Sequence, residues 1–75
     1  MPFKAFLTKA DADIARYDSL INVLKAMPVR TLDERARIDR NVCLTLASNI
    51  RNALEENRST MQDYINYYKI SEERL

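Results

Sequence analysis

The chain contains no glycine, and its two prolines are Pro2 and Pro28. Glycine takes a positive φ angle without strain, so helix ends, tight hairpins and phosphate-binding loops usually depend on it. Proline interrupts a helix, because it lacks a backbone N–H and its ring crowds the preceding turn. The 75 residues therefore have a single internal interruption, at Pro28, and the sequence predicts long helices on either side of it.

The segment before Pro28 has a regular apolar spacing. Its apolar residues recur in alternating steps of four and three, which places them on one face of a helix. Pro28 disfavours helical backbone at Met27, so we expect a helix from about residue 3 to 27. Thr8 offers a competing N-cap, and whether residues 3–7 are helical or an extended arm stays open. The expected inward face is Phe3, Leu7, Ala10, Ile14, Tyr17, Ile21 and Leu24.

A helix start signal follows the turn at residues 28–30. Thr31 and Glu34 have the spacing of a capping box, in which each side chain accepts a hydrogen bond from the backbone N–H of the other. We therefore expect a second helix from about residue 31 to 70, with Thr31 as its N-cap. Its expected inward stripe follows the same alternation, interrupted only at Asp39: Leu32, Ala36, Cys43, Leu46, Ile50, Ala53, Asn57, Thr60, Tyr64 and Tyr67.

These two lengths predict an all-α antiparallel helical hairpin with a longer second helix, forming one domain over residues 1–75. The second helix would be about 58 Å long and the first about 38 Å, which leaves roughly a third of the second helix uncovered. An alternative is a three-helix bundle with a break near residues 57–60, where weak helix formers cluster and Ser59 could begin another capping box. If the helix is continuous, its uncovered end would pack against another chain.

The composition argues against catalysis. The chain has no histidine, the commonest general base and metal ligand, and a single cysteine, Cys43, so we expect no enzyme activity, metal or cofactor. Cys43 lies on the apolar stripe and is expected to be a small buried residue, and the alternative is an exposed thiol that is redox-sensitive or bonds to another chain. A net charge of +1 suits neither a histone-like protein nor a nucleic-acid mimic. No apolar run is long enough for a membrane span and the N-terminal residues do not resemble a signal peptide, so we expect a cytoplasmic protein.

The best candidate for a functional surface is the C-terminal part of the second helix, which holds three of the four tyrosines. Tyrosine is enriched at protein interfaces, because it brings a large contact area and tolerates a wet rim. The alternative is that these rings pack back within the chain, on Phe3, Phe6 and Leu7 or on a folded-back third helix. We expect a small adaptor, inhibitor or assembly factor that docks helix against helix, with itself as a homodimer or with another protein. The expected partner-binding residues are Ile50, Met61, Tyr64, Ile65, Tyr67 and Tyr68.

Nucleic-acid binding is the alternative function. Arg30, Arg37, Arg51 and Arg58 are separated by multiples of seven residues, so they share a face of a continuous helix, and Arg40 lies beside that line. A dimer could present two such stripes to backbone phosphates. The residues of this regulatory alternative are Arg37, Arg40, Arg51 and Arg58.

Overall fold

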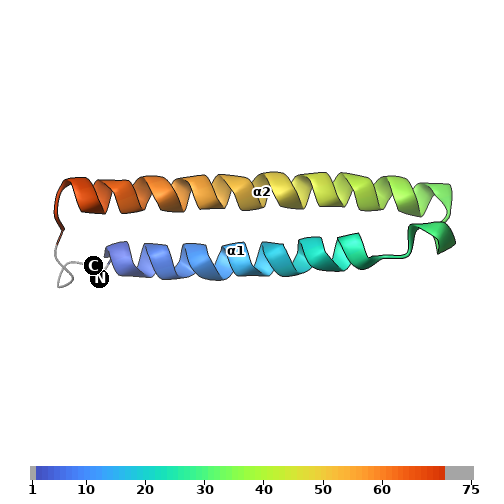
Figure 1. Ribbon diagram of the computed structural model, residues 1–75, viewed down its shortest axis with the longest axis horizontal. Coiled ribbons are helices and arrows are strands. Elements are labelled where there is room, and N and C mark those ends of the chain that lie inside the picture. The colour runs from blue at the N-terminus through green and yellow to red at the C-terminus, as the bar shows by residue number, and fades with distance from the viewer. Residues whose placement is uncertain (1, 71–75) are drawn as a thin grey trace.

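Two antiparallel helices form the structure, a computed structural model that describes residues 2–70. Helix α1 (Pro2–Ala26) lies beside helix α2 (Glu34–Tyr67), and the 3₁₀ turn η1 (Val29–Thr31) lies in the connection between them (Figure 1). The predicted all-α hairpin with a longer second helix is confirmed. Helix α2 runs unbroken through residues 57–60, so the three-helix alternative is not formed, and residues 3–7 belong to α1.

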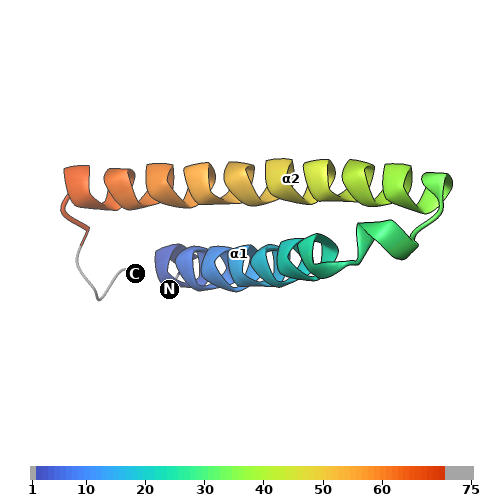
Figure 2. The ribbon, with the colours of Figure 1, turned by 45° about the vertical axis from the view of Figure 1, so that its right-hand side comes forward.

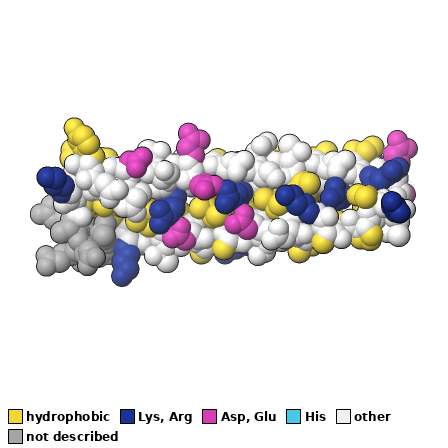
Figure 3. Space-filling model, in the orientation of Figure 1, with side chains coloured by type: hydrophobic (Ala, Val, Ile, Leu, Met, Phe, Trp, Pro, Cys, Tyr) yellow, Lys and Arg dark blue, Asp and Glu magenta, His cyan; other side chains and the backbone are white. Residues whose placement is uncertain are grey.

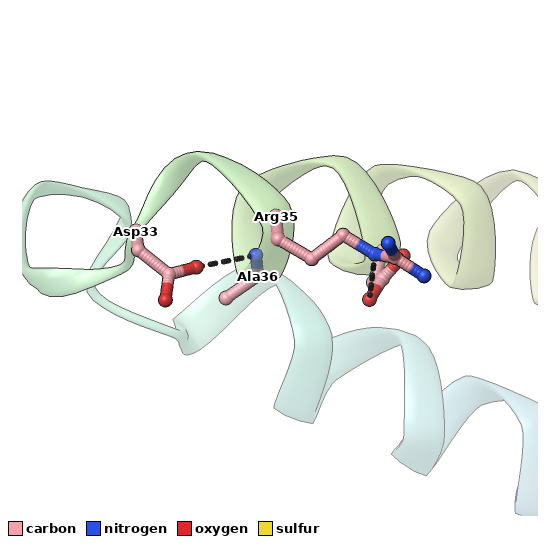
Figure 4. Close-up of polar contacts among 4 residues, drawn as sticks. Asp33, Arg35 and Ala36 are labelled. Atoms are coloured by element: carbon pink, nitrogen blue, oxygen red, sulfur yellow. Dashed lines mark hydrogen bonds and ion pairs between the residues drawn. The ribbon is translucent and has the colours of Figure 1, made fainter.

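The connection begins near Pro28, as the sequence predicted, but the N-cap of α2 is not the predicted Thr31. Asp33 is the cap, and its Oδ1 accepts a 2.8 Å hydrogen bond from the backbone N–H of Ala36 (Figure 4). Thr31 lies in η1, where its hydroxyl donates a 2.8 Å hydrogen bond to the carbonyl of Pro28. The predicted capping box was therefore wrong. Asp33 accepts as well as Thr31 would, and its negative charge also suits a helix N-terminus.

The C-terminal end of α2 compensates for the absence of glycine. Lys69 takes a left-handed conformation with φ 51°, a position that glycine usually occupies. The N–H of Ile70 donates to the carbonyl of Ile65 at 3.0 Å, and the N–H of Lys69 donates to that of Asn66 at 3.3 Å. These two bonds form a Schellman motif, which satisfies carbonyls at the helix end although the left-handed residue carries a full side chain.

Helix α1 packs through the predicted face. All seven residues of its expected stripe are buried or half-buried, and Ala10 and Leu24 are the most deeply covered. The alternation of four and three residues therefore identified the correct side of this helix.

Helix α2 packs through a different face from the predicted one. Ala47 and Ile65 are buried, whereas Cys43, Leu46 and Ile50 from the expected stripe are exposed. The residues turned toward α1 also recur in steps of four and three: Ala36, Arg40, Leu44, Ala47, Arg51, Leu54, Arg58, Met61 and Ile65. The arginines pass apolar stems along the interface and reach polar partners at its edge, so their charge does not prevent this packing.

The extra length of α2 lies at the opposite end from the one expected. Arg40 of α2 meets the end of α1, because its Nε donates to the carbonyl of Leu24 at 2.7 Å. At the other end, the ring of Phe3 stacks on the ring of Tyr64, with centroids 6.1 Å apart. The first turns of α2 therefore extend past α1, and η1 lies beside them (Figure 2). The expected bare C-terminal third of α2 is instead covered by the first turns of α1.

Candidate protein-docking face

One side of the hairpin is polar and ion-paired. Arg51 donates a 2.8 Å hydrogen bond from Nε to Asp18 and also pairs with Glu55. One heptad later, Arg58 donates a 2.6 Å hydrogen bond from Nε to Asp11. Figure 3 shows basic and acidic side chains next to one another along the line where the helices meet. The Asp18 and Asp11 hydrogen bonds raise the pKa of Arg51 and Arg58, respectively, so both guanidinium groups stay charged.

The opposite side of the hairpin carries exposed apolar side chains from both helices. We name it the apolar face and define it by Phe6 and Leu20 of α1, Met27 directly after α1, and Cys43, Leu46, Ile50 and Tyr64 of α2. An open groove of about 510 Å³ is lined by Phe3, Phe6, Asn57, Thr60, Met61 and Tyr64, so Phe6 and Tyr64 share one side. Leu20 and Met27 follow Phe6 by two and three heptads, which turns them only slightly away from it.

The apolar face of α2 has the spacing of a coiled-coil seam. Cys43, Ile50, Asn57 and Tyr64 are separated by seven residues, and Leu46, Ala53, Thr60 and Tyr67 alternate with them. Every one of these eight residues is exposed in the hairpin. The stripe expected to face α1 is therefore a second seam, and α1 leaves it uncovered.

The structure separates the six residues expected to bind a partner. Ile50 is 43% exposed and Tyr64 is 48% exposed, and both lie on the apolar face. Tyr67 and Tyr68 are more exposed, and Tyr68 links the three rings, with centroids 4.7 Å from Tyr64 and 4.9 Å from Tyr67. Met61 is half-buried and lines the groove. Ile65 is only 4% exposed, so it belongs to the interior of the hairpin and presents no surface to a partner.

The sequence interpretation missed the contribution of α1 to this surface. Phe6, Leu20 and Met27 are each at least 39% exposed. A second alternation of four and three contains them and could have identified them: residues 6, 10, 13, 17, 20, 24 and 27. It shares Ala10, Tyr17 and Leu24 with the inward stripe, so the apolar part of α1 is wider than one partner helix needs.

Most of the arginines expected to bind phosphate have partners within the hairpin. Arg51 and Arg58 are ion-paired with α1, and Arg40 donates to the Leu24 carbonyl and to the Asn41 side chain. Within residues 2–70, Arg37 alone of the four makes no side-chain hydrogen bond or ion pair. These contacts hold the guanidinium groups against the protein, where they do not form a continuous stripe for phosphates.

Cys43 is exposed, which corrects the expectation that it would be buried. No group of acidic or cysteine side chains in residues 2–70 is arranged to hold a metal ion. Neither of the two described helices has an apolar stretch sufficient to cross a lipid bilayer.

Comparison with known proteins does not assign this chain to a family. The chain matches no model of a protein family, no characterised protein and no solved structure.

Proposed function

We propose that this chain is a protein–protein interaction module that binds helices of a partner on its apolar face. The observation that carries the proposal is the exposed heptad seam of α2, which runs from Cys43 to Tyr67 beside the exposed Phe6 and Leu20 of α1 and the exposed Met27 that follows α1. Contiguous apolar surface of this kind marks an interaction site rather than an ordinary protein surface. Docking by such a face is how a small adaptor, inhibitor or assembly factor acts.

The spacing of the face supports a helix as the docked element. Residues in a heptad repeat form holes along a straight seam, and the apolar side chains of a second helix fit these holes as knobs. The open groove between α1 and α2 beside Phe6 and Tyr64 supplies a depression for one end of such a helix. An amphipathic helix in an apolar groove is a recurring mode of protein recognition.

The tyrosines support docking at the end of the face. Tyr64 is held between the ring of Phe3 and the ring of Tyr68, so its orientation is set before any partner arrives. A preset aromatic ring loses little rotamer freedom on binding. Tyr64 is therefore the proposed anchor at this end, with Ile50 and Leu46 as anchors near the centre.

The proposal is tested by comparing three tagged proteins for capture of partners from an extract of the native source. The first is the natural chain, the second is Leu46→Glu/Ile50→Glu on the apolar face, and the third is Asn52→Glu/Ser59→Glu on exposed positions outside it. We expect the first and third to retain the same protein and the second to lose it, with equal helix content by circular dichroism.

Retention of the same protein by the Leu46→Glu/Ile50→Glu variant would overturn the proposed docking face. A second contradicting result is capture of nucleic acid that disappears between low and moderate salt, because phosphate contacts are strongly salt-dependent and apolar docking is not.

A further inference from the structure

We infer that the partner on the apolar face is a second copy of this chain, and that two hairpins pack face to face as a four-helix bundle. The inference rests on the proposed function, since it names the occupant of the same face. Three properties of the hairpin carry it: its surface area, the charge of the face, and the length of the face.

A single hairpin exposes much more surface than a compact protein of its size. Its accessible area is 5951 Å², whereas a compact monomer of the same mass is expected to expose about 4,800 Å². The radius of gyration is 17.0 Å, against about 11 Å for a compact 75-residue domain. The excess area exceeds the roughly 800 Å² that each partner buries in a standard interface. A second hairpin would therefore bring the exposed area into the ordinary range.

The interior of the single hairpin is correspondingly thin. Only Ala10, Leu24, Ala47 and Ile65 are classed as buried among residues 2–70, and two of these are alanines. Six of the twelve larger apolar residues that remain exposed within residues 2–70 belong to the apolar face: Phe6, Leu20, Met27, Leu46, Ile50 and Tyr64. A second copy would convert them into the central layers of a bundle, where four helices share one core.

The charges beside the apolar face allow two copies of this face to pack against each other. Two neutral pairs within one chain lie beside it, Lys9 with Asp13 at 2.7 Å and Arg35 with Asp39 at 3.1 Å, together with Arg16, whose charge helps to lower the pKa of Asp13. Two identical surfaces with a net charge would repel each other, but these paired charges largely cancel. The remaining ion pairs, from Asp11 and Asp18 to α2, lie on the opposite side and stay in solvent.

The length of the face also matches a second copy. The face spans Phe6 to the end of α1, about 30 Å, and Cys43 to Tyr64 on α2, about 32 Å. A twofold axis presents the same patch from both partners, so one hairpin covers the full length of the other. Asn57 is the amide on the seam of α2, and a single polar residue at such a position fixes register and oligomeric state in coiled coils.

The test is the mass of the purified natural chain by light scattering, from micromolar to submillimolar concentrations. We expect twice the 8.8 kDa chain mass for the natural chain and for Asn52→Glu/Ser59→Glu, and the single mass for Leu46→Glu/Ile50→Glu. A helical monomer across this whole range would overturn the inference. If the chain is monomeric but captures another protein through the apolar face, the proposed function is still supported. If the chain is monomeric and captures no protein through this face, the inference and the proposed function are both wrong.

A second measurement uses the natural chain and so does not depend on the folding of a variant. Cys43 is exposed in one hairpin but lies on the apolar face, so a second copy would cover its thiol. We expect alkylation of Cys43 to slow about tenfold as the chain is concentrated into the dimer, since only the monomer fraction reacts. If Cys43 reacts as fast at concentrations where light scattering gives the dimer mass as it does in the urea-unfolded chain, its thiol is not covered and the inference is overturned.

Discussion

The Nε atom of Arg58 donates a 2.6 Å hydrogen bond to Oδ1 of Asp11, which is 47 residues earlier in the chain. Arg51 and Asp18 repeat this contact one heptad along both helices. Because the two pairs have the same spacing on α1 and α2, they are satisfied together in only one register and on one side of the hairpin. The two ion pairs therefore fix both the rotation of α2 about its own axis and its axial register against α1.

The first prediction concerns this pair of charges. Asp11→Arg places two arginines together and is expected to lower the thermal midpoint of unfolding. Asp11→Arg/Arg58→Asp restores opposite charges and is expected to recover most of that loss. Circular dichroism melts of the natural chain, both single variants and the double variant give the coupling between the sites. If the double variant melts no higher than the single variants, the contact does not contribute to register.

The second prediction concerns the left-handed residue at the end of α2. Lys69 has φ 51°, a conformation that disfavours any residue with a Cβ. Lys69→Gly is expected to raise the free energy of unfolding by about 1 kcal/mol, because glycine takes this conformation without strain. Lys69→Ala is the matched control and should gain little, since alanine keeps the Cβ. Equal gains from both variants would show that loss of the charge, rather than the backbone conformation, is responsible.

The third prediction separates the observed N-cap from the one expected from the sequence. Asp33→Ala removes the acceptor of the Ala36 N–H and is expected to cost about 1 kcal/mol of stability. Thr31→Ala loses only an exposed hydrogen bond within η1 and should stay within about 0.5 kcal/mol of the natural chain. Urea unfolding measures the stability of the two variants. A larger loss of stability in Thr31→Ala than in Asp33→Ala would indicate that the predicted capping box is formed.

The fourth prediction concerns the pH dependence of one ion pair. The hydrogen bond from Lys9 is the main cause that lowers the pKa of Asp13 below 3.8. A lowered pKa in the folded state stabilises the protein above the unfolded value, and that contribution is lost as the pH falls through the folded value. Titration of the Asp13 carboxyl by NMR is expected to show a midpoint below 3.8 in the natural chain. In Lys9→Ala the midpoint should rise, because the main cause of the lowered pKa of Asp13 is removed.

The fifth prediction tests which face of α2 is inward. Ile65 is 4% exposed, and Ile65→Ala is expected to cost about 2–4 kcal/mol. Tyr67 is 78% exposed, and Tyr67→Ala is expected to change stability by no more than about 0.5 kcal/mol when the chain is dilute. Thermal unfolding at low micromolar concentration compares the two variants. The reverse ranking would place the stripe expected from the sequence against α1.

The sequence left open whether the second segment is one helix or two, but by itself it determined the all-α class, the break at Pro28 and the packed face of α1. These depend on local properties: proline cannot continue a helix, and apolar residues spaced by four and three lie on one side. Most of the docking surface was also visible as a pattern in α2, although it was interpreted as the inward face. Phe6 and Leu20 were missed, because the apolar part of α1 is broad enough to serve two sides.

Only the tertiary structure decided which side of α2 meets α1. Two stripes of α2 satisfy helical periodicity equally, so local spacing could not choose between them. The choice depends on contacts between distant residues: Arg51 and Arg58 reach Asp18 and Asp11, and the small Ala10 and Ala47 are buried where the helices meet. Such pairs gain their stabilisation only when the helices are side by side, and this leaves the second stripe exposed as the proposed docking surface.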